Sequence, residues 1–117
     1  MSVGSPLGWI PHESSLSQWI QVAFAGPMSI EHIATAGLPK AEAWIVTYRL
    51  SYSSNGVDFN LLQNENGYPE DLWGNKNAVG FSLTKVCFNA THVRLWPQTW
   101  NGRIALRWEL FGCPLGK

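Results

Sequence analysis

The strongest constraint on the fold is the alternation of apolar and polar residues near the end of the chain, in residues 91–113. In residues 104–110 (IALRWEL), every second position is apolar, and this period of two is typical of a half-buried β-strand. Residues 92–96 alternate in the same way, and Asn101-Gly102 between the two runs suits a tight bend. We therefore predict a terminal hairpin whose apolar face packs against a second sheet.

Other segments have the same character and are separated by residues that favour turns. They are residues 18–24, 29–35, 44–52, 57–62, 79–83 and 86–88. In the third of these, the alternation assigns one face to Trp44, Val46, Tyr48, Leu50 and Tyr52. Gly26-Pro27 is expected to end the first strand, and Asn55-Gly56 is typical of a β-hairpin turn. Many short strands with turn signals between them predict an all-β fold, a jelly-roll β-sandwich.

Length and composition limit the classes of protein that remain. The 117 residues suit one domain, residues 1–117, with a loop-like segment in 1–17 and the sandwich core in 18–113. Hydrophobic residues make up 45% of the chain, and seven Trp exceed what one core needs, so we expect some at the surface. The formal net charge is zero and Lys and Arg form no run, which argues against nucleic acid as a partner.

The sequence offers no sign of membrane insertion. It contains no run of about 18 apolar residues, the length that a membrane span needs. Residues 1–8 have neither the basic flank nor the apolar run of a secretory signal. If the protein is extracellular, its signal would lie outside this chain.

Cys87 and Cys113 are too few for a disulfide framework, and two interpretations are open. The first is two unpaired thiols, one buried and one near the tail. The second is a disulfide, because the hairpin pairing of residues 92–96 with 104–108, extended outward, places Cys87 about opposite Cys113. Such a bridge would need suitable Cβ geometry.

From about Gly8 to Cys113, the chain resembles the discoidin domain family, also called coagulation factor 5/8 type C. The resemblance is carried by the tail pattern V-R-L-x-P-x-x-W-x-x-x-I-A-L-R-x-E-L-x-G-C and by residues 19–22 (WIQV), 33–37 (IATAG), 48–59 (YRLSYSSNGVDF) and 73–75 (WGN). It implies an eight-stranded, galactose-binding-like jelly roll with binding loops at one end. It also implies a module that binds anionic phospholipid, glycans or proteins and has no enzymatic activity of its own.

The chain also departs from the pattern of that family. The family usually begins with a Cys and a first strand, and neither is recognisable here, so we expect the N-terminal strand to be missing. Ala23 and Ala36 occupy positions where the family commonly has Asp and Gln. An uncovered sheet edge has unpaired backbone groups, which favours a homo-oligomer.

The longest loop, residues 63–78, contains most of the candidate ligand-binding residues: Tyr68, Glu70, Asp71, Trp73, Asn75 and Lys76. Sugar sites combine an aromatic face, which stacks on the C–H side of the ring, with carboxylate, amide and basic groups that bind the hydroxyls. The alternative is that Trp73 packs back onto the sandwich and holds the loop. Trp9 allows the same two interpretations, and the resemblance places it near the binding end.

Leu38 and Lys40 form a second candidate, in the turn of residues 37–44. An apolar side chain beside a basic one would suit a loop that touches an anionic membrane. The alternative is an ordinary connecting loop, because one apolar residue buries too little area for stable anchoring.

Other chemistry is less clearly indicated. Asn89-Ala90-Thr91 is an N-glycosylation acceptor, which would matter only in a secreted protein. The three His residues are scattered, with no metal-ligand spacing. Loop oxygens of Asp58, Glu65, Glu70 and Asp71 could bind calcium, but their spacing does not require it, so no cofactor is expected.

Together, these features predict a non-enzymatic extracellular recognition or adhesion module that binds a glycan or a protein partner through its end loops. Two alternatives are kept. One is peripheral binding to anionic phospholipid membranes, and the other is an oligomerising structural component of a matrix.

Overall fold

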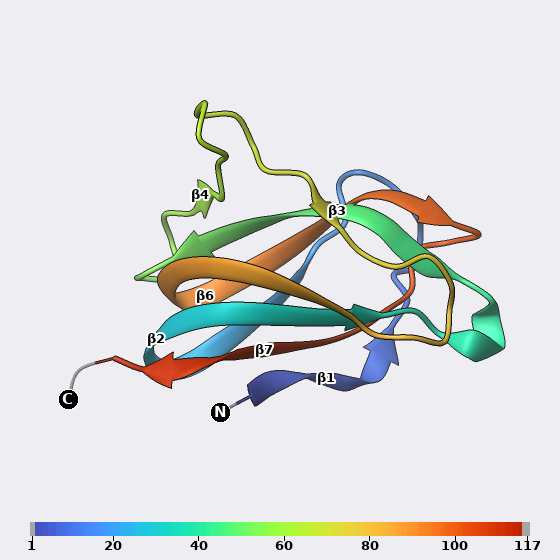
Figure 1. The fold of residues 1–117 in the computed structure, drawn as a ribbon, viewed down its shortest axis with the longest axis horizontal. Coiled ribbons are helices and arrows are strands. Elements are labelled where there is room, and N and C mark those ends of the chain that lie inside the picture. The colour runs from blue at the N-terminus through green and yellow to red at the C-terminus, as the bar shows by residue number, and fades with distance from the viewer. Residues whose placement is uncertain (1, 116–117) are drawn as a thin grey trace.

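The computed structural model describes residues 2–115, and apart from one short 3-10 helix its regular elements within them are twisted antiparallel strands (Figure 1). In chain order the elements are β1 (Ser2–Trp9), β2 (Ile20–Ala36), the 3-10 helix η1 (Pro39–Ala41), β3 (Trp44–Ser53), β4 (Asn60–Leu61), β5 (Leu72–Trp73), β6 (Ser82–Asn101) and β7 (Leu106–Pro114). The strand order is β1-β7-β2-β6-β3-β4, and β5 pairs with β3. The predicted all-β class is confirmed. Met1, Gly116 and Lys117 of the predicted domain lie outside the described residues.

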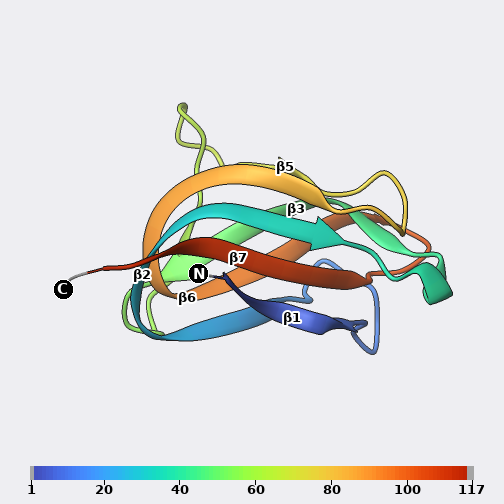
Figure 2. The same cartoon turned by 60° about the horizontal axis from the view of Figure 1, so that its bottom comes forward.

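The long strands β2 and β6 each belong to both layers of the sandwich (Figure 2). The start of β2 pairs with the second half of β6, as in Ile20 with Leu95, and its end pairs with the first half, as in Thr35 with Ser82. Between these stretches, residues 24–27 have no partner on β6, and this bulge turns both strands from one layer into the other. The predicted strand end at Gly26-Pro27 is wrong, because β2 bends there and continues.

We call the sheet of β1, β7, the end of β2 and the start of β6 the first layer. The second layer contains the start of β2, the end of β6, β3, β4 and β5. The core lies between the layers, and its largest fully buried side chains include Trp108, Tyr48, Leu50, Leu95 and Leu110. In β7 the predicted alternation is confirmed, because Leu106, Trp108 and Leu110 are buried while the residues between them are only half-buried. No helix within residues 2–115 is both long and apolar enough to cross a membrane.

The predicted terminal hairpin is wrong in its pairing. β6 and β7 follow each other in the chain, but β2 lies between them in the first layer and pairs with both. The second half of β6 pairs instead with β3 in the other layer. Alternation identifies a strand and its buried face, but it does not specify which strand lies beside it. The connection after β6 therefore crosses between layers instead of forming a tight hairpin.

This topology separates the two cysteines, which are both unpaired and exposed. Ser29 in β2 pairs with Cys113 on one side and with Asn89, near Cys87, on the other. The strands that carry the cysteines are thus two strand spacings apart, roughly 10 Å, whereas a disulfide needs Cα atoms within about 7 Å. The structure agrees with the first interpretation, two unpaired thiols, except that neither thiol is buried.

The predicted absence of a first strand is wrong, and so is the predicted loop over residues 2–9, whereas residues 10–17 form a loop as predicted. β1 pairs with β7 from Ser2 opposite Phe111 to Ser5 opposite Trp108, and again at Trp9 opposite Leu106. Pro6 lies in the interruption between the two paired stretches, and an edge strand tolerates a proline because one of its sides has no neighbour to receive an N–H. β1 therefore pairs with the edge of β7 that would otherwise be free, and β1 itself becomes the edge strand of the first layer.

β3 does not follow simple alternation near its start. Its register with β6 shifts between Ile45 and Tyr48, so that these two residues, which are 1% and 0% exposed, both face the core. Trp44 and Val46 consequently lie on the outer face of the second layer, and the prediction that they share the core face with Tyr48 is wrong. A bulge has this effect because one extra residue reverses the side to which the following residues point.

Replacing Trp108 with alanine tests the assignment of the core. Because Trp108 is 1% exposed, we expect Trp108→Ala to lower the free energy of unfolding by about 3–5 kcal/mol. Trp73→Ala is the control, because Trp73 is 74% exposed and surface substitutions usually change stability by less than about 0.5 kcal/mol. Urea unfolding followed by circular dichroism measures both values. Equal losses in the two variants would contradict this core.

Thiol reactivity tests the strand order. We expect both Cys87 and Cys113 to react with Ellman's reagent in the folded, non-reduced protein, because both are exposed and unpaired. Each single Cys→Ser variant should lose half of the signal. A chain that releases no thiol until a reductant is added would contradict the position of β2 between the two cysteines.

Candidate ligand-binding site

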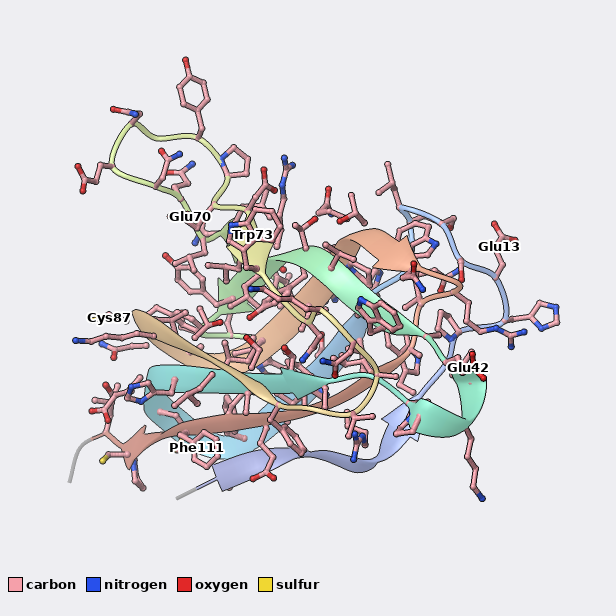
Figure 3. All side chains as sticks on the ribbon, turned by 45° about the vertical axis from the view of Figure 1, so that its right-hand side comes forward. Glu13, Glu42, Glu70, Trp73, Cys87 and Phe111 are labelled. Atoms are coloured by element: carbon pink, nitrogen blue, oxygen red, sulfur yellow. The ribbon has the colours of Figure 1, made fainter. Side chains whose placement is uncertain are left out.

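The short strand β5 determines how the longest loop sits on the sandwich. It pairs Leu72 with Tyr48 and Trp73 with Thr47, at the outer edge of β3. Leu72 is 9% exposed and belongs to the core, whereas Trp73 is 74% exposed, as alternation in a strand requires. Leu72 therefore holds the loop, and the indole of Trp73 faces outward. Figure 3 shows Trp73 and Glu70 on the side of the sandwich opposite Phe111.

Trp73 borders an open groove of about 390 Å³ on the outer face of the second layer. We call it the Trp73 groove, and its lining consists of Trp44, Val46, Trp73, Gly74, Asn75, Lys76 and Asn101. Three of the predicted residues, Trp73, Asn75 and Lys76, therefore meet in one place. Trp44 and Asn101 were not predicted, because the alternation placed Trp44 on one face with Tyr48 and Leu50, and Asn101 in a turn.

Asn75 supports the groove from below and is 7% exposed. Its side-chain NH₂ donates to the carbonyl oxygens of Thr35 (2.9 Å) and Gly80 (3.0 Å), and its backbone N–H donates to that of Ile45 (2.9 Å). Gly74 is also in close contact, since a Cβ added there would lie 2.6 Å from the Ile45 oxygen. These contacts tie the turn after β5 to β2 and β3, so that Trp73 and Lys76 project from a fixed backbone.

The other predicted residues of this loop lie elsewhere. Tyr68 is 68% exposed, in a turn that the side chain of Asn64 stabilises by accepting the backbone N–H of Tyr68. Asp71 accepts a hydrogen bond from Nε of Arg49 at 2.7 Å, on a different part of β3. Glu70 is half-buried, and its backbone N–H donates to Leu62. None of these three side chains lines the Trp73 groove.

The second candidate loop does not project an isolated apolar tip. Leu38 is half-buried and packs against Gly8, where an added Cβ would lie 2.7 Å from a Leu38 methyl group. Lys40, in η1, is exposed. Both residues line a separate hollow of about 470 Å³ with Ile10 and Arg107. Trp9 is half-buried, packs against the core and does not reach the Trp73 groove.

Some of the remaining acidic side chains near these loops take part in local hydrogen bonds. Among residues 2–115, no three His, Cys, Asp or Glu side chains are placed to hold a metal ion. Asp58 accepts a hydrogen bond from the Asn55 side chain, and Asp71 is bonded to Arg49. Burial raises the pKa of Tyr48 to about 12, so its hydroxyl stays protonated at neutral pH. Asn89 is exposed on β6, and its glycosylation stays a prediction.

This geometry, a sandwich with an aromatic-lined groove on a supported loop, is that of a lectin-like binding module. The model of the F5/8 type C domain matches residues 3–110, so the chain belongs to this family, which is also called the discoidin domain family. Its members are binding modules for carbohydrates, proteins or phospholipids. The predicted resemblance and the discoidin-like fold are confirmed.

Two solved structures of discoidin II from Dictyostelium discoideum, one of the wild-type protein and one of the native recombinant protein, are similar to this chain. Each has a TM-score of 0.82 and 25% sequence identity and covers 93% of this chain. The match extends over 42% of the discoidin II chain. This chain therefore spans less than half the length of the protein that it resembles.

Replacing Asn75 tests the support of the groove. Asn75→Ala leaves the carbonyl groups of Thr35 and Gly80 without their side-chain donor, and an unsatisfied buried polar group costs about 1–3 kcal/mol. We expect a loss of this size in urea unfolding and faster hydrogen exchange in residues 74–81. Asn66→Ala, at an exposed position of the same loop, should change neither. Unchanged stability in Asn75→Ala would show that the turn is held by other contacts.

Proposed function

We propose that this protein is a non-enzymatic extracellular adhesion module that binds a carbohydrate in the Trp73 groove. The observation that carries the proposal is the pair Leu72 and Trp73, which are 9% and 74% exposed. One residue anchors the loop in the core, and the other holds a large aromatic ring in solvent at the wall of a groove. Ligand sites are typically grooves lined by aromatic side chains with a few polar groups beside them.

The chemistry of the groove suits a sugar ring. Trp73 and Trp44 provide aromatic faces for the C–H side of the ring, from two different strands. Lys76 and Asn101 are exposed. The Lys76 ammonium can donate hydrogen bonds to sugar hydroxyls, and the Asn101 amide can donate or accept them. The groove of about 390 Å³ lies within the usual range of ligand sites, roughly 300–1,000 Å³. An opening of this kind fits one or two sugar units.

A second candidate is peripheral binding to an anionic membrane, as predicted, but by a different loop. Val79 and Phe81 come shortly after the groove residues Trp73–Lys76 in the chain and are 71% and 60% exposed. The exposed Lys76 belongs to the same loop. Apolar side chains beside a basic one suit an anionic lipid surface. Leu38 contributes less than predicted, because it packs against Gly8. Self-association and the extracellular location stay predictions.

Glycan binding by the Trp73→Ala variant tests the first proposal. On a glycan array and in calorimetry with the best array ligand, we expect affinity to fall roughly thirtyfold, because truncating a central aromatic residue costs about 2 kcal/mol or more. Tyr68→Ala is the matched control, since Tyr68 is a comparably exposed aromatic residue of the same loop that does not line the groove. Its affinity should change by less than about twofold.

Vesicle sedimentation separates the two candidates. Vesicles with and without phosphatidylserine are compared for the unmodified protein, Trp73→Ala and Val79→Asp. Salt-sensitive binding that depends on phosphatidylserine and is lost in Val79→Asp would favour the membrane candidate. Full glycan affinity in Trp73→Ala would contradict the carbohydrate proposal.

A further inference from the structure

A second groove, of about 310 Å³, opens further along the outer face of the second layer. We call it the Trp96 groove, and its lining consists of Arg49, Ser51, Phe59, Leu61, Trp96 and Gln98. No residue of this groove lines the Trp73 groove. β3 contributes to both grooves, with Trp44 and Val46 in one and Arg49 and Ser51 in the other. The Trp96 groove therefore has its own floor and walls.

The aromatic floor of this groove is held in place before any ligand arrives. Nε1 of Trp96 donates a hydrogen bond to Oγ of Ser51 at 3.0 Å, which fixes the orientation of the indole and uses its only donor. Trp19 packs beside it with ring centroids 6.0 Å apart. The guanidinium of Arg94 lies 4.0 Å from the Trp19 ring centroid and 3.8 Å from that of Phe59. Trp96 thus offers a ring face, and not a hydrogen-bond donor, to a ligand.

Some hydrogen-bond donors and acceptors of the groove are free to bind a ligand. Gln98 donates through Nε2 to the carbonyl oxygens of Trp96 and Pro97, both at 3.3 Å, which leaves its Oε1 as an acceptor. Arg49 donates a hydrogen bond from Nε to the carboxylate of Asp71. Its two terminal NH₂ groups donate no hydrogen bond within residues 2–115. The groove therefore presents an aromatic face, an amide acceptor and guanidinium donors within a small space.

The charge of this surface favours an anion. Arg49 lines the groove, Arg94 lies against the ring of Phe59 at its wall, and the carboxylate of Asp71 is already bonded to Nε of Arg49. Asp58, next to Phe59, accepts a hydrogen bond from Asn55 and, within residues 2–115, forms no ion pair with either arginine. A planar guanidinium with free N–H groups binds carboxylate or sulfate in a bidentate manner.

We infer that the Trp96 groove is a second carbohydrate site, specific for a pyranose that carries a carboxylate or sulfate group. The ring stacks on Trp96, the anionic group binds Arg49, and a hydroxyl donates to Oε1 of Gln98. An extended acidic peptide fits less well, because the adjacent edge strand β4 has only two residues and offers little backbone for strand pairing. This inference does not depend on the Trp73 groove, whose residues it does not use.

Matched monosaccharides test it directly. The full chain is titrated with methyl β-glucuronide, methyl β-glucoside and glucose 6-sulfate, with the Trp96 indole N–H and the Gln98 side-chain NH₂ as NMR reporters. We expect the two anionic sugars to shift both signals and the glucoside to bind at least about tenfold more weakly, because a hydrogen bond to a charged group is worth about that factor. Arg49→Gln should abolish this preference.

Two further variants keep the test sharp. Gln98→Ala keeps the aromatic floor and should weaken binding of both anionic sugars about threefold to tenfold. Arg103→Gln removes an exposed arginine outside the groove and should leave it unchanged. Equal binding of glucuronide and glucoside, or full binding in Arg49→Gln, would overturn the inference. So would shifts caused by an acidic hexapeptide and by none of the sugars.

Discussion

The rest of the structure depends on the pairing of β2 with β6. The two strands are paired on both sides of the bend at residues 24–27, so they fix the position of each sheet relative to its partner. β7 pairs with β2 in the first layer, and β3 pairs with β6 in the second. Because both sheets grow from the same ribbon, their inner faces close on one core, with Trp108 and Tyr48 fully buried in it. The two grooves on the outer face of the second layer are therefore formed on strands that this pairing holds in place.

Alternation in β5 and a departure from it in β3 together shape the Trp73 groove. In β5, Leu72 enters the core and Trp73 faces out, so the same two residues anchor the loop and expose the indole. In β3, the register shift after Ile45 sends Trp44 and Val46 to the outer face, where they form the opposite wall of the Trp73 groove. A strand without this shift would bury Trp44 and leave Trp73 on a flat surface.

Much of the fold and part of the site could be predicted from residue order. The alternation of β7 and the turn at Asn55-Gly56 are local properties, and the jelly-roll class follows from the succession of short strands and turns; the structure confirms all three. Trp73, Asn75 and Lys76 were also assigned to one loop, and they do meet in one groove. The Trp96 groove was not predicted, because its residues come from strands and turns that are far apart in sequence. The stacking of Arg94 on Trp19 and Phe59 was not predicted for the same reason, because these residues are far apart in sequence.

By itself, the order of residues determined where strands form and which of their faces is apolar, because these follow from side-chain periodicity within a few residues. Only the tertiary structure decided which strands pair, since partners are chosen by the packing of the whole core. That choice placed β2 between Cys87 and Cys113, laid β1 along the edge of the first layer, and turned Trp44 outward. Each of these results depends on contacts between segments that are distant in the chain, and no local pattern encodes them.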